Sequence, residues 1–256
     1  MPTRDGYPEG VPSWADLATS DLEGAKNFYA KLFGWEFYNG GTDEMPYIMA
    51  TKNGLAAAGI GVLMNENTPS VWSTYFAVDD ADATVEKIKQ SGGTIVMECM
   101  DIFDSGRMAF AADPTGAVFG IWQAREHTGA GIVNEHGALN WNELLSDNLD
   151  SAFEFYAAVF GHSFETAEMP NGPYTSISAG DRVVAGAMPK PMPEIPNYWG
   201  VYFAVDDAPA AIATATSNGG QTTYGPMEIP DVGTFGGLVD PYGAHFTVIQ
   251  LAQPVD

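Results

Sequence analysis

The chain repeats itself after 127 residues, and this repeat constrains the fold more than any other feature. Trp14 recurs as Trp141, Trp72 recurs as Trp199, and no insertion or deletion changes the interval. Solenoid repeats have periods of about 20–50 residues, so a repeat of this length is a whole domain. Residues that folding requires should recur in both copies, whereas a functional site need occur only once. Phe28-Tyr29 and Phe155-Tyr156, and Asp113-Pro114 and Asp240-Pro241, follow the same interval.

Length and charge predict two acidic globular domains. The chain has 256 residues, which allows two domains, each long enough to bury its own core. It contains 33 acidic and 10 basic residues, a formal net charge of -23. Nucleic acids and anionic membranes require a surface rich in Lys and Arg, so we expect neither as a partner. The acidity predicts solubility, with an acidic binding face as the alternative.

The single cysteine and the N-terminal sequence favour a cytoplasmic location. Cys99 has no partner for an intrachain disulfide, which fits a reducing compartment. We interpret this thiol as a small apolar filler rather than a nucleophile. Residues 1–10 contain no apolar stretch typical of a signal peptide. No run of about 18 apolar residues occurs, so we expect no membrane span.

Hydrophobic periodicity predicts four βαβββ units, two in each copy. Alternation places Trp14 and Asp16 on one face of a short first strand. A helix follows, begun by the capping-box pattern Ser20-x-x-Glu23 and ended by Gly34. Short strands come next, and after residue 69 the strand–helix–strand pattern starts again, with Asp79-Asp80 before the second helix. The predicted class is α+β.

The boundary between the copies is predicted at a segment without periodicity. Residues 125–137 contain three glycines and two histidines and read as a linker. The predicted domains are therefore residues 1–124 and residues 138–256. Two such modules could pair within one chain and give a monomer, and a homodimer is the alternative.

Three motifs, each present in both copies, carry a family resemblance. They are the segment 20–34 with its Phe28-Tyr29 pair, the segment 75–80, and the turn at 113–116. With the four-unit pattern, they resemble the vicinal oxygen chelate superfamily, which includes glyoxalase I, extradiol dioxygenases, and bleomycin- and fosfomycin-resistance proteins. Residues 103–108, 141–145 and 201–207 are similar to two-module actinobacterial glyoxalase-like proteins. The resemblance implies tandem modules whose curved mixed sheets form ligand-binding cups.

The resemblance also implies where a metal would bind. Metal enzymes of the superfamily use a His on the first strand, a His or Gln where the third unit-opening strand begins, and a Glu on the last strand. Tryptophan and glycine offer no side-chain donor, and hydroxyl groups are weak ligands for divalent ions. We therefore expect no metal cofactor, with a divalent metal held by other residues as the alternative. The corresponding positions are Trp14 and Trp141, Ser73 and Gly200, and Gly120 and Thr247.

The four histidines do not restore such a ligand set. His127 and His136 lie in the predicted linker, and His162 follows a helix-ending glycine, which predicts a surface position. His245 alternates with Thr247, so it should face the second cup. It is a candidate catalytic residue, and a hydrogen-bonded wall residue is the alternative.

Alternation predicts two aromatic cups that hold one carboxylate each. Burial would raise the pKa of Asp16 and Glu143, which suits general acid–base catalysis. The alternative is a structural hydrogen bond to Tyr75 or Tyr202. The predicted catalytic residues are Glu143, Asp16 and His245, and the predicted ligand-binding residues are Trp14, Tyr75, Arg107, Trp122, Trp141, Tyr202 and Thr247.

Several of these residues also have a structural interpretation. Trp14 and Trp141 either stack on a ligand or fill the vacated metal position. Arg107 would hold an anionic ligand near the first cup, or form a surface ion pair with a nearby aspartate at 101 or 104. Trp72 and Trp199 are expected to point away from the cups, into helix packing.

Three functions compete at this point. The first is a metal-independent protein that binds a small molecule, either to sequester it or to catalyse isomerase- or lyase-type chemistry. The second is a metal-dependent glyoxalase or dioxygenase-like enzyme with displaced ligands such as Glu143 and His245. The third is a non-catalytic protein that binds a partner and whose cups are vestigial. Resemblance in fold does not choose among them.

Overall fold

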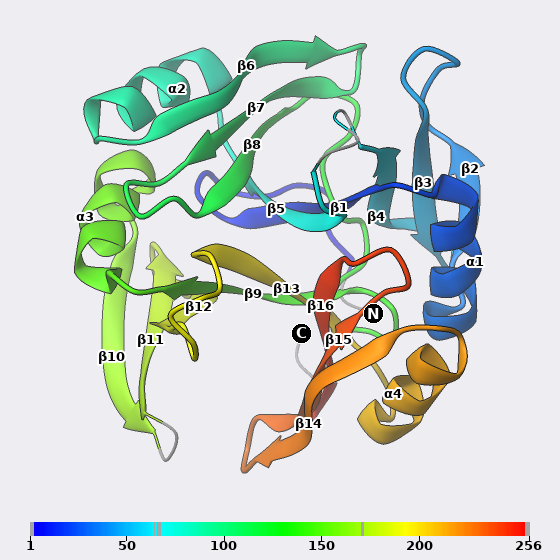
Figure 1. Cartoon of the computed structure of the whole chain (residues 1–256). Coiled ribbons are helices and arrows are strands. Elements are labelled where there is room, and N and C mark those ends of the chain that lie inside the picture. The colour runs from blue at the N-terminus through cyan, green and yellow to red at the C-terminus, as the bar shows by residue number, and fades with distance from the viewer. Residues whose placement is uncertain (1–2, 64, 66–67, 170–171, 254–256) are drawn as a thin grey trace.

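The computed structural model describes residues 3–63, 65, 68–169 and 172–253. Each copy forms one eight-stranded mixed sheet with two helices, as the α+β prediction requires (Figure 1). Among these residues, no helix combines the length and apolar character needed to cross a bilayer. The first copy comprises β1 (Pro12–Thr19), α1 (Leu22–Phe33), β2 (Glu36–Asn39), β3 (Tyr47–Lys52), β4 (Leu55–Val62), β5 (Val71–Ala77), α2 (Ala81–Gln90), β6 (Thr94–Ile102), β7 (Gly106–Ala112) and β8 (Val118–Ala124).

The second copy repeats the same order of elements. It comprises β9 (Leu139–Ser146), α3 (Leu149–Phe160), β10 (Ser163–Met169), β11 (Gly172–Ala179), β12 (Arg182–Pro189), β13 (Tyr198–Ala204), α4 (Ala208–Ser217), β14 (Gln221–Ile229), β15 (Gly233–Val239) and β16 (His245–Leu251). The strand orders are β2-β3-β4-β1-β5-β8-β7-β6 and β10-β11-β12-β9-β13-β16-β15-β14. The four predicted βαβββ units are therefore confirmed.

The helix ends follow local sequence with one correction. The predicted capping box at Ser20 is wrong, because Asp21 is the N-cap of α1 and its carboxylate accepts a hydrogen bond from Gly24 N. Gly34 ends this helix in the left-handed conformation at φ 66°, as predicted. Asp80 caps α2 by accepting from Ala83 N. A short polar side chain that can accept from the first helical turn is needed at each start, and Asp meets that need as well as Ser.

Each copy is long enough to bury a core of its own, but the two copies share their largest cores. One buried cluster combines α1 and β1 of the first copy with β13, α4 and β16 of the second. A second cluster combines α2, β7 and β8 with β9, α3 and β12. Accordingly α1 packs on α4, and α2 packs on α3 (Figure 1). The first half of each copy thus packs on the second half of the other.

Reciprocal hydrogen bonds reinforce this exchange. The hydroxyl of Tyr29 donates to Asp240 at 3.0 Å and accepts from Trp72 Nε1 at 2.9 Å. In the same way, Tyr156 donates to Asp113 at 3.0 Å, and Trp199 Nε1 donates to Tyr156 at 2.7 Å. The expectation that Trp72 and Trp199 point into helix packing is confirmed. The recurring Asp-Pro turns have a structural role, because each aspartate accepts a hydrogen bond from a tyrosine of the other copy.

The segment 125–137 connects the copies but is also part of the packed structure. Ala130 N donates to Ser13 O at 2.8 Å, and Gly131 N donates to Ala56 O at 2.8 Å. Ile132 is fully buried in the shared core. These backbone bonds hold the segment against the first sheet, which has consequences for the site.

Candidate functional site

The register of the central strands brings one carboxylate and its neighbours together on each sheet. We call the face of the first sheet that carries Trp14 and Asp16 the first cup, and the equivalent face of the second sheet the second cup. Trp14 lies opposite Tyr75, and Asp16 lies between Ser73 and Gly59 of the neighbouring strands. The alternate residues of β1 point the other way, into the shared core.

The first cup contains a hydrogen-bonded chain of four side chains. Trp14 Nε1 donates to Tyr47 Oη at 3.0 Å, and Tyr47 Oη donates to Asp16 Oδ2 at 3.3 Å. Tyr75 Oη donates to the same carboxylate oxygen at 3.0 Å. Burial raises the pKa of Asp16 to about 7, although the two tyrosine hydrogen bonds oppose the shift. The hydrogen bond that we predicted as the structural alternative for Asp16 is therefore present.

The second cup repeats this chain with a longer carboxylate. Trp141 Nε1 donates to Tyr174 Oη at 2.9 Å, and Tyr202 Oη donates to Glu143 Oε2 at 2.6 Å. Only 6% of Glu143 is exposed. Burial raises its pKa, against hydrogen bonds from Tyr202 and Tyr174. A carboxyl group whose pKa is raised by burial is suited to act as a general acid or base.

Sequence reasoning missed Tyr47 and Tyr174, although the repeat contained the clue. Both tyrosines recur at the interval of 127 residues, and so do Gly59 and Gly186. A Cβ atom added to Gly59 or Gly186 would fall within 2 Å of the hydroxyl of Tyr47 or Tyr174, respectively. Each glycine therefore leaves the space in which a tyrosine hydroxyl reaches the carboxylate. A recurring glycine–tyrosine pair on neighbouring strands would have pointed to this contact.

The cups differ in what covers them. His127 of the connecting segment packs edge-on against Trp14, with ring centroids 4.5 Å apart, and Trp122 Nε1 donates to His127 O at 2.8 Å. Ala130 and Val133 of the same segment are buried against Trp14 in a third cluster. Trp14 is only 3% exposed. The first copy's own continuation therefore occupies much of the first cup.

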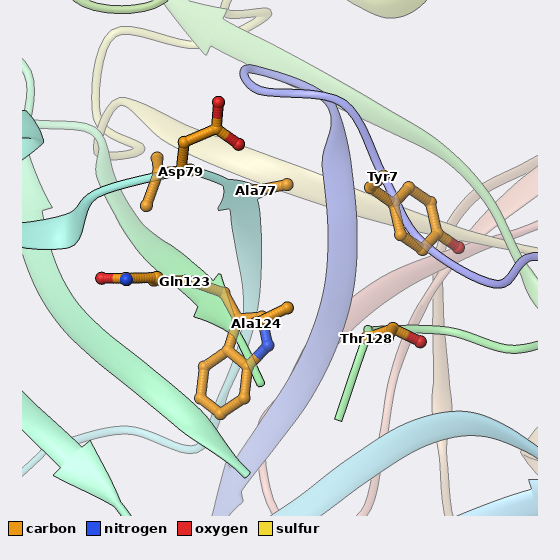
Figure 2. A pocket seen from close by; sticks show the side chains of 8 residues that line it. Tyr7, Ala77, Asp79, Gln123, Ala124 and Thr128 are labelled. Atoms are coloured by element: carbon orange, nitrogen blue, oxygen red, sulfur yellow. The ribbon is translucent and has the colours of Figure 1, made fainter. Parts of the chain in front are cut away.

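A small pocket lies beside this covering segment. A pocket of about 160 Å³ lies between Tyr7 and Thr128 on one side and the ends of β5 and β8 on the other (Figure 2). Trp122, a predicted ligand-binding residue, lines it. Pockets for drug-sized ligands have volumes of about 300–1,000 Å³. The pocket contains neither Asp16 nor Glu143.

The second cup keeps its aromatic groups in contact with solvent. Trp141, Tyr174 and Tyr198 are half-buried, and Tyr224 is 38% exposed. The described residues form no third-cluster equivalent over this sheet. Among the residues that the structure describes, no chain segment covers the second cup as residues 127–133 cover the first. The second cup is thus the more accessible of the two.

Two compensating substitutions reshape the wall of the second cup. The first cup has Phe110 beside Gly120, and Tyr75 lies over that glycine. The second cup has Gly237 and Thr247 at these positions. The ring of Tyr224 lies over Gly237, and its hydroxyl is 2.8 Å from Thr247 Oγ1. The large side chain on this wall is Phe110 of β7 in the first cup and Tyr224 of β14 in the second. This difference brings a tyrosine hydroxyl into the second cup.

Two predicted positions are wrong. Arg107 lies on the helix-covered face with Ala109, because Met108 and Phe110 take the cup-facing positions of β7. Its guanidinium binds Asp82 of α2 at 2.9 Å and Asp101 at 3.3 Å, so it is in the ion-pair arrangement and not near the first cup.

His162 is buried rather than on the surface. The N-terminal segment of the chain covers it, and its Nε2 lies 2.7 Å from Gly10 O. His245, the first residue of β16, is exposed, whereas Thr247 is 7% exposed inside the second cup. Of the two candidate catalytic residues on this sheet, the one enclosed by the cup is therefore Glu143. The catalytic roles of Asp16, Glu143 and His245 stay predictions.

The residues at the family's metal positions do not fit a metal. Trp14 and Trp141 direct their indole N–H groups to tyrosines, and an N–H donor has no lone pair for a cation. Within the described ranges, no three His, Cys, Asp or Glu side chains are grouped to hold a metal ion. Each cup instead has one carboxylate whose lone pairs accept from tyrosines.

Fold and sequence comparisons define the class. The sequence profile of the Glyoxalase/Bleomycin resistance protein/Dioxygenase superfamily matches residues 12–121. The manganese-bound glyoxalase of Novosphingobium aromaticivorans superposes with a TM-score of 0.67 at 16% identity, over 97% of this chain and 85% of the other. Together with the full-length relatives described next, these matches show that the chain belongs to this superfamily, also known as the vicinal oxygen chelate superfamily.

Two relatives align with this chain over nearly their whole length. "Putative glyoxylase CFP32" of Mycobacterium tuberculosis is 48% identical over 263 aligned positions, which cover 98% of this chain and 99% of the relative. "Anthracycline biosynthesis protein DnrV" of Streptomyces peucetius is 30% identical and covers 96% of this chain and 95% of its own length. Family membership and tandem organisation are thus established from sequence as well as fold.

Proposed function

We propose that the chain binds a flat, ring-bearing small molecule in its second cup and does so without the usual metal triad. The observation that carries this proposal is the Trp141–Tyr174–Glu143–Tyr202 network, in which Trp141 stands at the position of the family's first metal ligand. Tryptophan and tyrosine rings bury large apolar area and stack on planar ligands. The accessible rings of the second cup, beside the covered first cup, support the choice between the two.

Binding serves either sequestration or proton-transfer chemistry of the isomerase or lyase type. Glu143 is the group that would transfer the proton, because it is enclosed by the cup and its pKa is raised by burial. The name of the Streptomyces peucetius relative refers to anthracycline biosynthesis. Anthracyclines are planar polycyclic compounds, which is consistent with a stacking site. A metal is not needed for either role.

Elemental analysis of the purified protein tests the metal part of the proposal. After dialysis without chelator, we expect well below one divalent ion per chain. One tightly held ion per chain would refute metal independence and favour the alternative in which Glu143 and His245 are displaced ligands. In that case, turnover lost with EDTA and restored by one divalent ion would complete the assignment.

A thermal-shift panel of planar aromatic metabolites tests the binding part. We expect a ligand-dependent rise in melting temperature that is lost in Trp141→Ala. Trp14→Ala in the covered first cup is the matched variant, since it removes the same indole from the equivalent strand. If no metabolite raises the melting temperature, the third function, a partner-binding protein with vestigial cups, is favoured instead.

A further inference from the structure

The second cup surrounds its carboxylate with tyrosines from several strands. Burial raises the pKa of Tyr174, Tyr198, Tyr202 and Tyr224, and the charge of Glu143 adds to the shift in each case. Hydrogen bonds place these side chains on one face of the sheet: Tyr202 Oη donates to Glu143 at 2.6 Å, and Trp141 Nε1 donates to Tyr174 Oη at 2.9 Å. The hydroxyl of Tyr224 lies 2.8 Å from Thr247 Oγ1 on the same face. The four tyrosines come from β11, β13 and β14, and Trp141 of β9 completes the set. We call these five aromatic residues the aromatic cage.

Glu143 has no basic partner within the described part of the chain. The hydrogen bonds to its carboxylate come from tyrosine hydroxyls. The ion pairs of the described residues do not include it. A buried carboxylate is normally paired with a cation or with several hydrogen-bond donors. Ionised Glu143 would therefore leave a negative charge that a cation from outside could balance.

The cage offers the surface that such a cation prefers. Aromatic rings carry a negative face, and a cation within about 6 Å of the ring centre is attracted to it. Tyr202 Oη donates a hydrogen bond to Glu143, and this bond makes the phenol ring richer in electron density. Tyr224 is 38% exposed, and Trp141, Tyr174 and Tyr198 are half-buried, so all four residues are in contact with solvent. The net charge of -23 adds long-range attraction for cations.

The first cup lacks two members of this cage. Val71 stands at the position of Tyr198, and Met97 stands at the position of Tyr224. Asp16 keeps only the two tyrosines that correspond to Tyr174 and Tyr202. The repeat thus supplies an internal comparison, because the carboxylate and its two tyrosine donors are common to both cups and the two additional tyrosines are not.

We infer that the second cup selects ligands that carry an organic cation, such as an alkylated ammonium group attached to an aromatic ring. This inference rests on the proposed function, and it names the class of ligand for the same site. The aromatic part of the ligand stacks within the cage, and its ammonium group lies against the tyrosine faces with Glu143 behind them. A strongly hydrated metal ion gains little from ring faces, whereas an alkylated ammonium ion loses little water there.

Two compounds of nearly equal shape separate charge from shape. 3-Hydroxyphenyltrimethylammonium and 3-tert-butylphenol differ in the positive charge of one central atom. Isothermal titration calorimetry at pH 7, where both phenol groups are mostly neutral, should give at least about tenfold tighter binding of the cation, the gain expected of a partly desolvated cation on aromatic rings. Glu143→Gln, which retains an oxygen to accept from Tyr202, should abolish the preference. Near-ultraviolet circular dichroism checks that each variant is folded.

Control variants locate the effect. Glu165→Gln removes the same charge from an exposed position of β10, the edge strand of the same sheet, and should retain the preference. Tyr224→Met and Tyr198→Val import the residues of the first cup and should weaken binding of the cation more than binding of the neutral phenol. Tyr224→Phe keeps the ring and should retain most of the preference.

The outcomes separate failure of the cation inference from failure of the proposed function. Equal affinity for both compounds would overturn the cation inference and leave small-molecule binding standing. A preference that survives Glu143→Gln, or that disappears in Asp16→Asn instead, would also overturn it. If neither compound binds and the metabolite panel gives no shift, the proposed function fails together with the inference.

Discussion

Because the two copies share their cores, the loss of one buried hydroxyl oxygen at the contact between them should lower stability strongly. In Tyr29→Phe the ring remains, but the hydroxyl that joins Trp72 Nε1 to Asp240 is lost. Tyr29 is fully buried, and Trp72 and Asp240 are each 3% exposed, so water cannot replace it. The variant therefore leaves a buried donor without an acceptor and removes one donor from a buried carboxylate.

The magnitude follows from these two losses. An unsatisfied buried polar group costs about 1–3 kcal/mol, and more when it is charged. Asp240 keeps the backbone N–H groups of Tyr242 and Ala244 on its other oxygen, which limits its share. We expect Tyr29→Phe to lower the free energy of unfolding by about 2–4 kcal/mol. Domains have total stabilities of about 5–15 kcal/mol, so the loss is easily measured.

Urea unfolding, followed by circular dichroism and by tryptophan fluorescence, measures this loss. Tyr156→Phe breaks the equivalent bonds to Trp199 and Asp113 and should give a similar value. Tyr38→Phe removes the same atom from a residue that is 54% exposed, and it should change stability by less than about 0.5 kcal/mol. Losses below about 0.5 kcal/mol in both buried variants would refute the view that these bonds join the copies.

Three further predictions follow from the same contacts. Burial raises the pKa of Asp16 from 3.8 to about 7, so the folded protein binds more protons than the unfolded chain between these values and loses stability as pH rises. Asp16→Asn should therefore be more stable than the parent by about 1–2 kcal/mol at pH 8, after allowance for partial solvent screening. At pH 4 the variant and the parent should be equally stable. Equal stability of the two proteins at both pH values in urea unfolding would contradict this prediction. Gly186→Ala should displace Tyr174 and abolish ligand binding in the thermal-shift assay, whereas Gly200→Ala, whose added Cβ would have no neighbour closer than 3.6 Å, should retain it. Either copy expressed alone should fail to give a cooperative urea transition, because its cores end at the surface that the other copy covers.

Much of the fold was predictable because it depends on local patterns. Alternation along β1 and helical spacing in α1 placed the strands and helices in order, and Gly34 ended its helix as expected. Capping was less well predicted, since Ser20 and Asp21 are both good N-cap residues and local sequence does not choose between them. The exchange of halves was not predicted, because hydrophobic periodicity says which face is buried and not which surface buries it.

The candidate site was likewise predictable only in part. Alternation puts Asp16 and Tyr75 on the same face of neighbouring strands, and Glu143 and Tyr202 likewise, so these two pairs were within reach of sequence. Tyr47 and Tyr174 come from β3 and β11, strands that lie two places away in the sheet, and only strand order brings them to the carboxylates. Arg107 was misplaced by one step of alternation, which moves a side chain to the opposite face of the sheet.

The sequence by itself determined the duplicated architecture, the superfamily, and the replacement of the family's His, Gln and Glu at its metal positions by other residues. These depend on residue identity at fixed spacings, and the repeat gave every position a counterpart for comparison. Tertiary structure alone decided that the copies share their cores and that residues 127–133 cover the first cup while the second stays accessible. The reason is physical: packing is non-directional, so contacts between residues more than a hundred positions apart depend on which surfaces meet and not on local pattern.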